Sequence, residues 1–141
     1  GIMLAVYCSV ILQLTLVCRQ DNSRIGMELD IFHGLRGGDN EFHWLMISYV
    51  ALNSLLFVPY GFIISLFSFV NNRKAPVQML LVTLTSLIAS ISIEVSQFIT
   101  GRGYYEIQDM VFNTLGGFIG WILFAIIYNI GRRIVNRNME R

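Results

Sequence analysis

Four long apolar runs dominate the chain and restrict what it can fold into. They cover about residues 2–17, 44–70, 77–99 and 110–130. A helix needs roughly 20 apolar residues to cross a bilayer, and three of the four runs reach that length. The composition agrees, because 55% of the residues are hydrophobic and only 13% are charged, which is more apolar than a soluble domain requires. We therefore expect an all-α integral membrane protein, a four-helix bundle forming one domain over residues 1–141.

The first apolar run is the shortest of the four, at residues 2–17. The chain opens on Gly1 with neither Met nor a basic residue before this run, so we expect the natural start to lie further upstream. A cleaved signal peptide is the competing interpretation. It is disfavoured because no charged segment precedes the run and no small-x-small cleavage site follows it.

Basic residues separate the two sides of the expected bundle. Arg73 and Lys74 lie between the second and third runs, and arginines from Arg132 onward fill the tail. Positive residues favour the cytoplasmic side of a membrane, so loop two and the C-terminus are expected there. Loops one and three, which carry most of the carboxylates, are then outside.

The first loop is the only long connection, and its glycines around residues 34–38 predict turns. A short helix is expected near residues 24–29. His33 and His43 flank this region, but their spacing matches no metal site, so no metal is expected. The sequence also lacks cofactor-binding and hydrolase motifs and shows no basic groove for nucleic acid, so we expect neither a cofactor nor a nucleic-acid partner.

The third apolar run contains the residues that most need an explanation. Glu94 and Gln97 lie deep within it, and a charged side chain at membrane depth costs several kcal/mol on most scales. At about 100° per residue, they share one helical face with Thr83, Ser86 and Ser90. The serines and threonine are typical of helix packing, where they bond backbone carbonyls. Glu94 and Gln97 are not needed for packing and are therefore candidate functional residues.

The fourth run carries a matching stripe, formed by Asp109, Asn113, Gly116 and Gly120, within about 60° by the same helical spacing. The two glycines belong to a G-x-x-x-G element and predict close helix packing. Asp109 has two open interpretations. It is expected either to cap the N-terminus of the fourth helix or to act directly in function.

The second run adds Asn53 and the segment from Pro59 to Gly61. Proline removes one backbone hydrogen bond and frees the carbonyl of Leu55, which predicts a bend with partners nearby. Asn53 is one candidate partner. Counting along each helix from its outer end places Asn53, Glu94 and Asn113 in the outer half of the membrane, with Arg102 above them as a counter-charge.

This series of polar residues resembles the VanZ-like family of bacterial membrane proteins. The residues that carry the resemblance are Asn53, Leu56–Phe62, Glu94, Gln97, Arg102, Asp109, Asn113, Gly116 and Gly120. Fixed polar intervals are rare in membrane helices, and the match spans essentially the whole chain. The resemblance implies a four-helix protein of the bacterial cytoplasmic membrane, linked to reduced susceptibility to glycopeptide antibiotics and to teicoplanin in particular.

Two classes of function remain open. In the first, an outer-leaflet pocket binds a lipid headgroup, a lipid-linked cell-wall precursor or a drug's acyl tail. Arg102 then pairs with an anionic group while Asn53, Gln97 and Asn113 supply hydrogen bonds. In the second, Glu94 and Asp109 act as an acid/base pair of an enzyme that modifies such a lipid. A homo-oligomer that gates a path for a small solute is a weaker third alternative.

Overall fold

The computed structural model describes residues 1–17, 24–30 and 40–139, and most of these residues are helical. The elements in chain order are α1 (Ile2–Leu12), the π-helical turn η1 (Gln13–Val17), β1 (Arg24–Glu28), α3 (Asn40–Ser65), α4 (Ser68–Asn71), α5 (Ala75–Thr100), β2 (Arg102–Glu106) and α6 (Ile107–Met139). The first, third and fourth expected helices therefore form close to their predicted bounds, and the third and fourth are longer than predicted.

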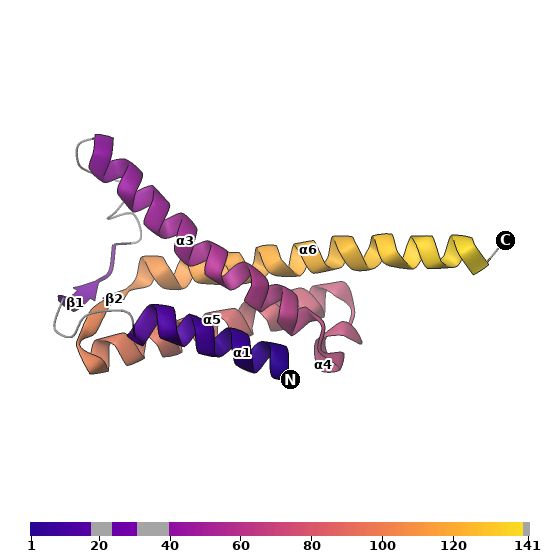
Figure 1. Cartoon of the computed structure of the whole chain (residues 1–141), viewed down its shortest axis with the longest axis horizontal. Coiled ribbons are helices and arrows are strands. Elements are labelled where there is room, and N and C mark those ends of the chain that lie inside the picture. The colour runs from indigo at the N-terminus through magenta and orange to yellow at the C-terminus, as the bar shows by residue number, and fades with distance from the viewer. Residues whose placement is uncertain (18–23, 31–39, 140–141) are drawn as a thin grey trace.

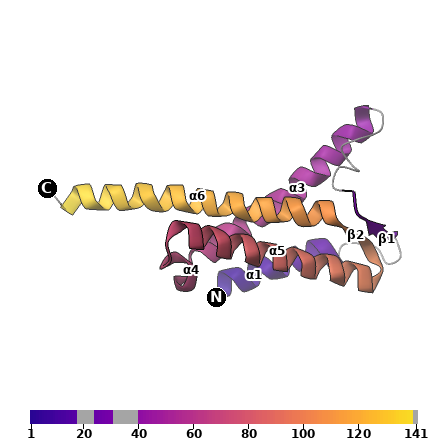
Figure 2. The same cartoon turned by 180° about the vertical axis from the view of Figure 1, so that it is seen from behind.

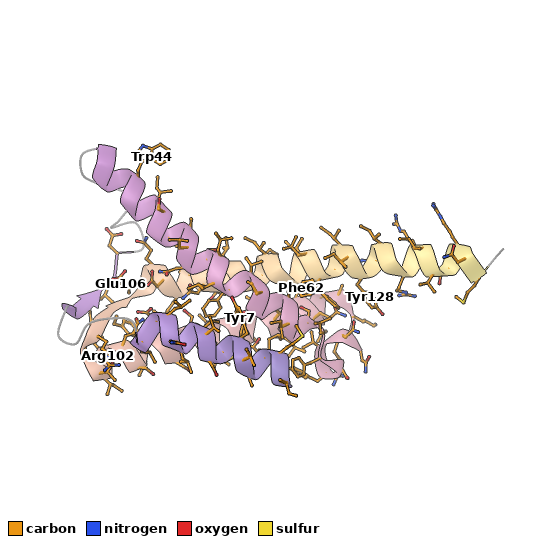
Figure 3. The ribbon with its side chains drawn as sticks, viewed as in Figure 1. Tyr7, Trp44, Phe62, Arg102, Glu106 and Tyr128 are labelled. Carbon is orange, nitrogen blue, oxygen red and sulfur yellow. The ribbon has the colours of Figure 1, made fainter. Side chains whose placement is uncertain are left out.

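Helices α1, α3, α5 and α6 lie alongside one another for part of their length (Figures 1 and 2). The two strands occupy one end of the molecule, which we call the strand end, while α4 and the C-terminus lie toward the other end (Figure 1). The N-terminal part of α3 diverges from the other helices, and Trp44 on it is largely exposed (Figure 3). The C-terminal half of α6 extends beyond the bundle.

Two helices are long and apolar enough to cross a membrane, namely Ala75–Thr100 and Ile107–Met139. Two shorter apolar helical segments accompany them, Ile2–Leu16 and Val50–Ser65. Large apolar side chains such as Ile88 on α5 remain exposed on these helices. Exposed apolar surface of this extent is typical of proteins that face lipid, where hydrocarbon rather than water covers the surface.

The second expected helix, over residues 44–70, is divided in the structure. Helix α3 ends at Ser65, and α4 begins at Ser68. The backbone N–H groups of Leu66 and Phe67 each donate to a carbonyl three residues back, at 3.1 Å. These bonds tighten the chain into a turn. Hydropathy continues without interruption across this turn, which is why the apolar pattern did not reveal it.

The short helix expected near residues 24–29 is wrong, because this segment forms strand β1. It pairs in parallel with β2, from Arg24 opposite Arg102 to Glu28 opposite Glu106. Backbone pairing to a segment far along the chain therefore decides the conformation of these few residues, and local sequence does not contain that partner. The turns expected around residues 34–38 lie outside the described residues.

Glycines bring the backbones of α3 and α6 into direct contact. A Cβ atom on Gly61 would overlap the carbonyl oxygen of Gly117, and one on Gly116 would overlap that of Ser54. Gly120 faces the carbonyl of Val58 in the same way. The packing positions proposed for Gly61, Gly116 and Gly120 thus lie where the two helices are closest, and any side chain there would separate them.

Pro59 lies on an exposed part of α3, and the helix continues past it to Ser65. Tyr7 of α1 donates its hydroxyl to the carbonyl of Leu56, at 2.6 Å, one residue beyond the carbonyl that proline frees. The expected bond from Asn53 to Leu55 is absent, because the Nδ2 atom of Asn53 is buried without a partner among the described residues. This region of α3 therefore packs against α1 instead.

Candidate functional site

Buried polar residues gather where the last turns of α5 meet the first turns of α6. We define the polar cluster as Ser90, Glu94, Gln97, Gln108, Asp109 and Asn113. Each of them is at most 7% exposed, and Glu94 and Gln97 are 1% exposed. The cluster lies toward the strand end, the end at which Figure 3 labels Arg102 and Glu106. Burying so many polar side chains is costly unless they find partners, so their hydrogen bonds decide what the cluster can do.

Glu94 links α5 to the start of α6. Its Oε2 atom accepts a hydrogen bond from the backbone N–H of Glu106, at 2.9 Å. Because α6 begins at Ile107, Glu106 is the residue that precedes the helix. Glu94 thus supplies, from another helix, the carboxylate that pairs with an otherwise unbonded N–H at a helix start.

Asp109 is not the N-cap of α6, which corrects one of its two sequence interpretations. The helix begins at Ile107, three residues earlier than that role requires, so Asp109 is its third residue. Its buried carboxyl still lies in the first turn, where a negative charge interacts favourably with the helix dipole. The sequence pattern located the helix start correctly only to within three residues, which is the usual uncertainty at helix ends.

Gln97 and Arg102 hold the end of the first helix. The Nε2 atom of Gln97 donates to the carbonyl of Thr15 at 2.9 Å. The Nη1 atom of Arg102 donates to the neighbouring carbonyl of Leu16 at 3.2 Å. Carbonyls at a helix C-terminus lack partners within the helix, so these two side chains satisfy groups that α1 and η1 leave open.

The other side of the Gln97 amide has no such partner. Its Oε1 atom is buried and accepts no hydrogen bond in the part of the chain that the structure describes. A buried acceptor without a donor costs on the order of 1–3 kcal/mol. A hydrogen-bond donor on a ligand would therefore gain more binding free energy at this atom than at an acceptor that is already bonded.

Asn113 joins α6 to α5 through its Nδ2 atom, which donates to the Ser90 hydroxyl at 2.9 Å. Asn53 is half-buried on α3, and its own Nδ2 has no partner among the described residues. The structure thus brings together Glu94, Gln97, Asp109 and Asn113 in one cluster, with Arg102 beside it. The amide nitrogen of Asn53 therefore donates to no residue of that cluster.

Sequence reasoning missed three contributors to the site. Ser90 was assigned to packing, although its position one turn before Glu94 was a usable signal. Gln108 gave no periodic signal of its own. The backbone N–H of Glu106 was not foreseen as a partner of Glu94, because side-chain patterns carry no information about backbone donors in a distant connection.

Comparison with known proteins places the chain in a family. No curated protein and no solved structure shows a significant match to the chain. A family model described as VanZ/LLP1 matches residues 2–128, which include every residue of the polar cluster. Together with the helices that are long and apolar enough to cross a bilayer, this match identifies a membrane protein. The chain belongs to the VanZ/LLP1 family.

Proposed function

We propose that this protein lowers the susceptibility of a bacterial cell to teicoplanin-like glycopeptides by binding a lipid, a lipid-linked cell-wall precursor or the drug's acyl tail at the polar cluster. Membership of the VanZ/LLP1 family is consistent with a protein associated with teicoplanin resistance. The observation that carries the proposal is the fully buried Gln97 amide, whose oxygen accepts no hydrogen bond from any described residue. A site that leaves one acceptor open inside an otherwise bonded cluster is suited to a ligand.

The arrangement of charges supports a lipid-like ligand. Arg102 lies beside the cluster and donates to the carbonyl of Leu16, and a guanidinium is the side-chain group whose planar N–H donors suit a phosphate or carboxylate. The apolar helices around the cluster suit a hydrocarbon tail, in which each buried methylene contributes about 0.8 kcal/mol. In this proposal Asn53, Gln97 and Asn113 supply hydrogen bonds to the polar part of the ligand.

A second candidate function rests on the two carboxyl groups. Glu94 and Asp109 are both buried in the same cluster, an arrangement in which one carboxyl serves as acid and the other as base. The protein would then modify an envelope lipid. Mass spectrometry of lipid extracts from cells that express wild type or Glu94→Gln separates the two functions, since only an enzyme changes the lipids it meets.

The proposal includes four membrane crossings, with loops one and three outside and loop two and the C-terminus in the cytoplasm. Strands β1 and β2, which belong to connections one and three, pair with each other at the strand end (Figure 1), and this pairing supports loops one and three lying on the same side. Single cysteines at Asp39 and Asn72, in a background without Cys8 and Cys18, test which end faces outward. Labelling of Asp39→Cys but not Asn72→Cys by an impermeant reagent in intact cells is expected, and the reverse pattern would refute the orientation.

The test of function compares drug sensitivity in a susceptible Gram-positive host. Cells receive wild type, Arg102→Ala, Asn113→Ala or the control Asn129→Ala, and blotting checks membrane levels. Asn129 is an exposed residue of the helix that carries Asn113, and its side chain donates to the carbonyl of Ala125, one turn back on that helix. Wild type and the control should protect against teicoplanin, whereas the two site variants should protect less.

Vancomycin provides the second arm, because it lacks the acyl tail that would draw a drug to the membrane. Protection against vancomycin should be weaker than against teicoplanin. Equal protection by all four proteins against teicoplanin would show that the polar cluster plays no part in protection. Equal protection by the wild type against both drugs would show that the drug's acyl tail is not needed, without excluding a role for the cluster.

A further inference from the structure

A groove runs along one side of α6 where this helix leaves the bundle (Figure 1). Its volume is about 350 Å³, and its lining includes Trp121, Ala125, Ile126, Ile130 and Arg133. All of its lining residues belong to α6, so no other described element covers it. Ile126 and Ile130 are accordingly 51% and 53% exposed. An open apolar groove of this kind on a membrane helix is accessible to lipid.

Contacts with the rest of the bundle fix the groove at Trp121. Its Nε1 atom donates to Oε1 of Gln78, near the start of α5, at 3.4 Å. Its ring stacks on Phe118, with the ring centroids 5.8 Å apart. From Trp121 to Arg133 the groove covers roughly 18 Å along the helix axis, at 1.5 Å per residue. The hydrocarbon of one leaflet is about 15 Å thick, so the groove has the length of one extended acyl layer.

The other end of the groove lies among basic residues. Arg133 lines the groove and is exposed, Arg132 is its neighbour, and Arg137 lies one turn further along α6. Arg73 and Lys74, which directly precede α5, lie at the same end of the bundle as α4 (Figure 2). A guanidinium suits a phosphate because its planar N–H donors match two phosphate oxygens. The groove therefore joins an apolar channel to a group that binds phosphate.

The sequence places few carboxylates near these charges. It contains no Asp or Glu in residues 42–93 or 110–139, which include α4, the start of α5 and the C-terminal half of α6. The last two residues, Glu140 and Arg141, cancel in charge. The basic residues should therefore attract a headgroup with net negative charge. A choline headgroup fits less well, because its ammonium would meet the arginines.

We infer that this groove binds an anionic phospholipid, with one acyl chain along the apolar side chains from Trp121 to Ile130 and the headgroup phosphate at Arg133. In the proposed orientation this lipid belongs to the cytoplasmic leaflet. The groove lies toward the opposite end of the molecule from the polar cluster (Figure 1). The inference thus adds a second site and does not depend on the proposed function.

The test measures which lipids stay bound to the purified full-length protein. The protein is placed in nanodiscs that contain equal amounts of phosphatidylglycerol and phosphatidylcholine with identical acyl chains, and native mass spectrometry counts the retained lipids. Phosphatidylglycerol should be enriched about fivefold or more, since one basic residue near the membrane surface contributes about 1 kcal/mol. Identical acyl chains ensure that the comparison reports on the headgroup.

Two arginine variants test the headgroup position. Arg133→Gln removes the charge at the end of the groove and should lower the enrichment about fivefold. Arg137→Gln is the matched control, because it removes the same charge one turn away, at a residue that does not line the groove. The control should lower the enrichment less than about twofold. Both residues are exposed, so neither change should disturb folding.

Two phenylalanine variants test the acyl position. Ala125→Phe fills the groove without changing any charge and should lower the number of retained lipids of both kinds. Leu123→Phe adds a ring at an exposed residue of the same helical turn that does not line the groove. This control should retain as many lipids as the wild type.

Each contrary result overturns the inference in a different way. Equal retention of the two lipids by the wild type would exclude recognition of negative charge. An unchanged enrichment in Arg133→Gln would exclude the headgroup position, and unchanged retention in Ala125→Phe would exclude the groove. Enrichment lost in Asn113→Ala but kept in Arg133→Gln would assign the lipid to the polar cluster and support the proposed function instead. A mass of two chains without retained lipid would show that a second copy covers the groove.

Discussion

The contact between α3 and α6 differs in kind from the contacts that hold α1. Helices α3 and α6 meet backbone to backbone, at glycines where no side chain fits. Helix α1 contributes one buried residue, Ile11, and exposes most of its surface. Tyr7 bonds α1 to α3, and Gln97 and Arg102 donate to carbonyls of η1, directly after α1. Ile11 belongs to the apolar core, and Leu4 and Cys8 pack against that core. Helices α3 and α6 are therefore joined by backbone contact, whereas α1 is held by side-chain packing and a few polar bonds.

This difference matters because the polar cluster is closed in the structure. Gln97 belongs to the cluster and at the same time holds the carbonyl of Thr15. Polar bonds between membrane helices contribute only about 0.6 kcal/mol on average. Moving the end of α1 away from Gln97 should therefore cost less free energy than separating α3 from α6, which are in backbone contact.

The largest effect is expected from adding a methyl group where α3 and α6 are in backbone contact. Gly61→Ala and Gly116→Ala place a Cβ atom on the backbone of the facing helix, so each should destabilise the protein by about 1–3 kcal/mol or more. Gly131→Ala is the control, because nothing lies within 4 Å of its added Cβ. Unfolding of the purified proteins in denaturing detergent measures the difference. Equal stability of all three variants would show that α3 and α6 are not in backbone contact.

Glu94 offers an intermediate test at the junction of α5 and α6. Glu94→Leu leaves the backbone N–H of Glu106 without its acceptor, which should cost about 1–3 kcal/mol. Glu94→Gln keeps an acceptor oxygen in place and should cost less, about 1 kcal/mol, since only the charge assistance is lost. The same unfolding assay ranks the two. A Leu variant as stable as the Gln variant would contradict a role for this bond.

The smallest effect is expected at α1. Tyr7→Phe removes the hydroxyl that donates to Leu56 at 2.6 Å and should weaken the attachment of α1 by about 0.6 kcal/mol, equivalent to about threefold. Cys8, a half-buried free thiol next to it, reports on this attachment. In a background without Cys18, alkylation of Cys8 should accelerate by about that factor. An unchanged rate, with Ser9→Ala as control, would indicate that α1 is held by its apolar contacts alone.

The helices and most of the candidate site could be predicted from the sequence. Apolar runs determine where long helices form in a membrane protein, and polar residues at helical spacing identified Glu94, Gln97, Asp109 and Asn113, which the structure brings together. Both signals are local and periodic, so one helix suffices to reveal them. The structure gives less support to Asn53, whose half-buried amide nitrogen donates to no residue of the cluster.

The remaining features depend on partners that local sequence does not contain. Strand β1 forms by pairing with β2, and the bond from Glu106 to Glu94 uses a backbone group that every residue possesses. The break after Ser65 occurs inside a continuous apolar run, where hydropathy is uniform and only the backbone bonds of Leu66 and Phe67 show the turn. Gly117 was missed as a packing residue because the G-x-x-x-G pattern drew attention to its neighbours.

The unequal lengths of the two longest helices have a consequence for the membrane around the protein. Helix α5 has 26 residues and α6 has 33, or about 39 Å and 50 Å at 1.5 Å per residue. The surplus of α6 lies at its free C-terminal end, away from the strand end (Figure 2). Because that surplus carries Arg132, Arg133 and Arg137, hydrocarbon can cover α6 only about as far as Ile130, and the last turns extend past the acyl chains to where arginines meet the headgroups.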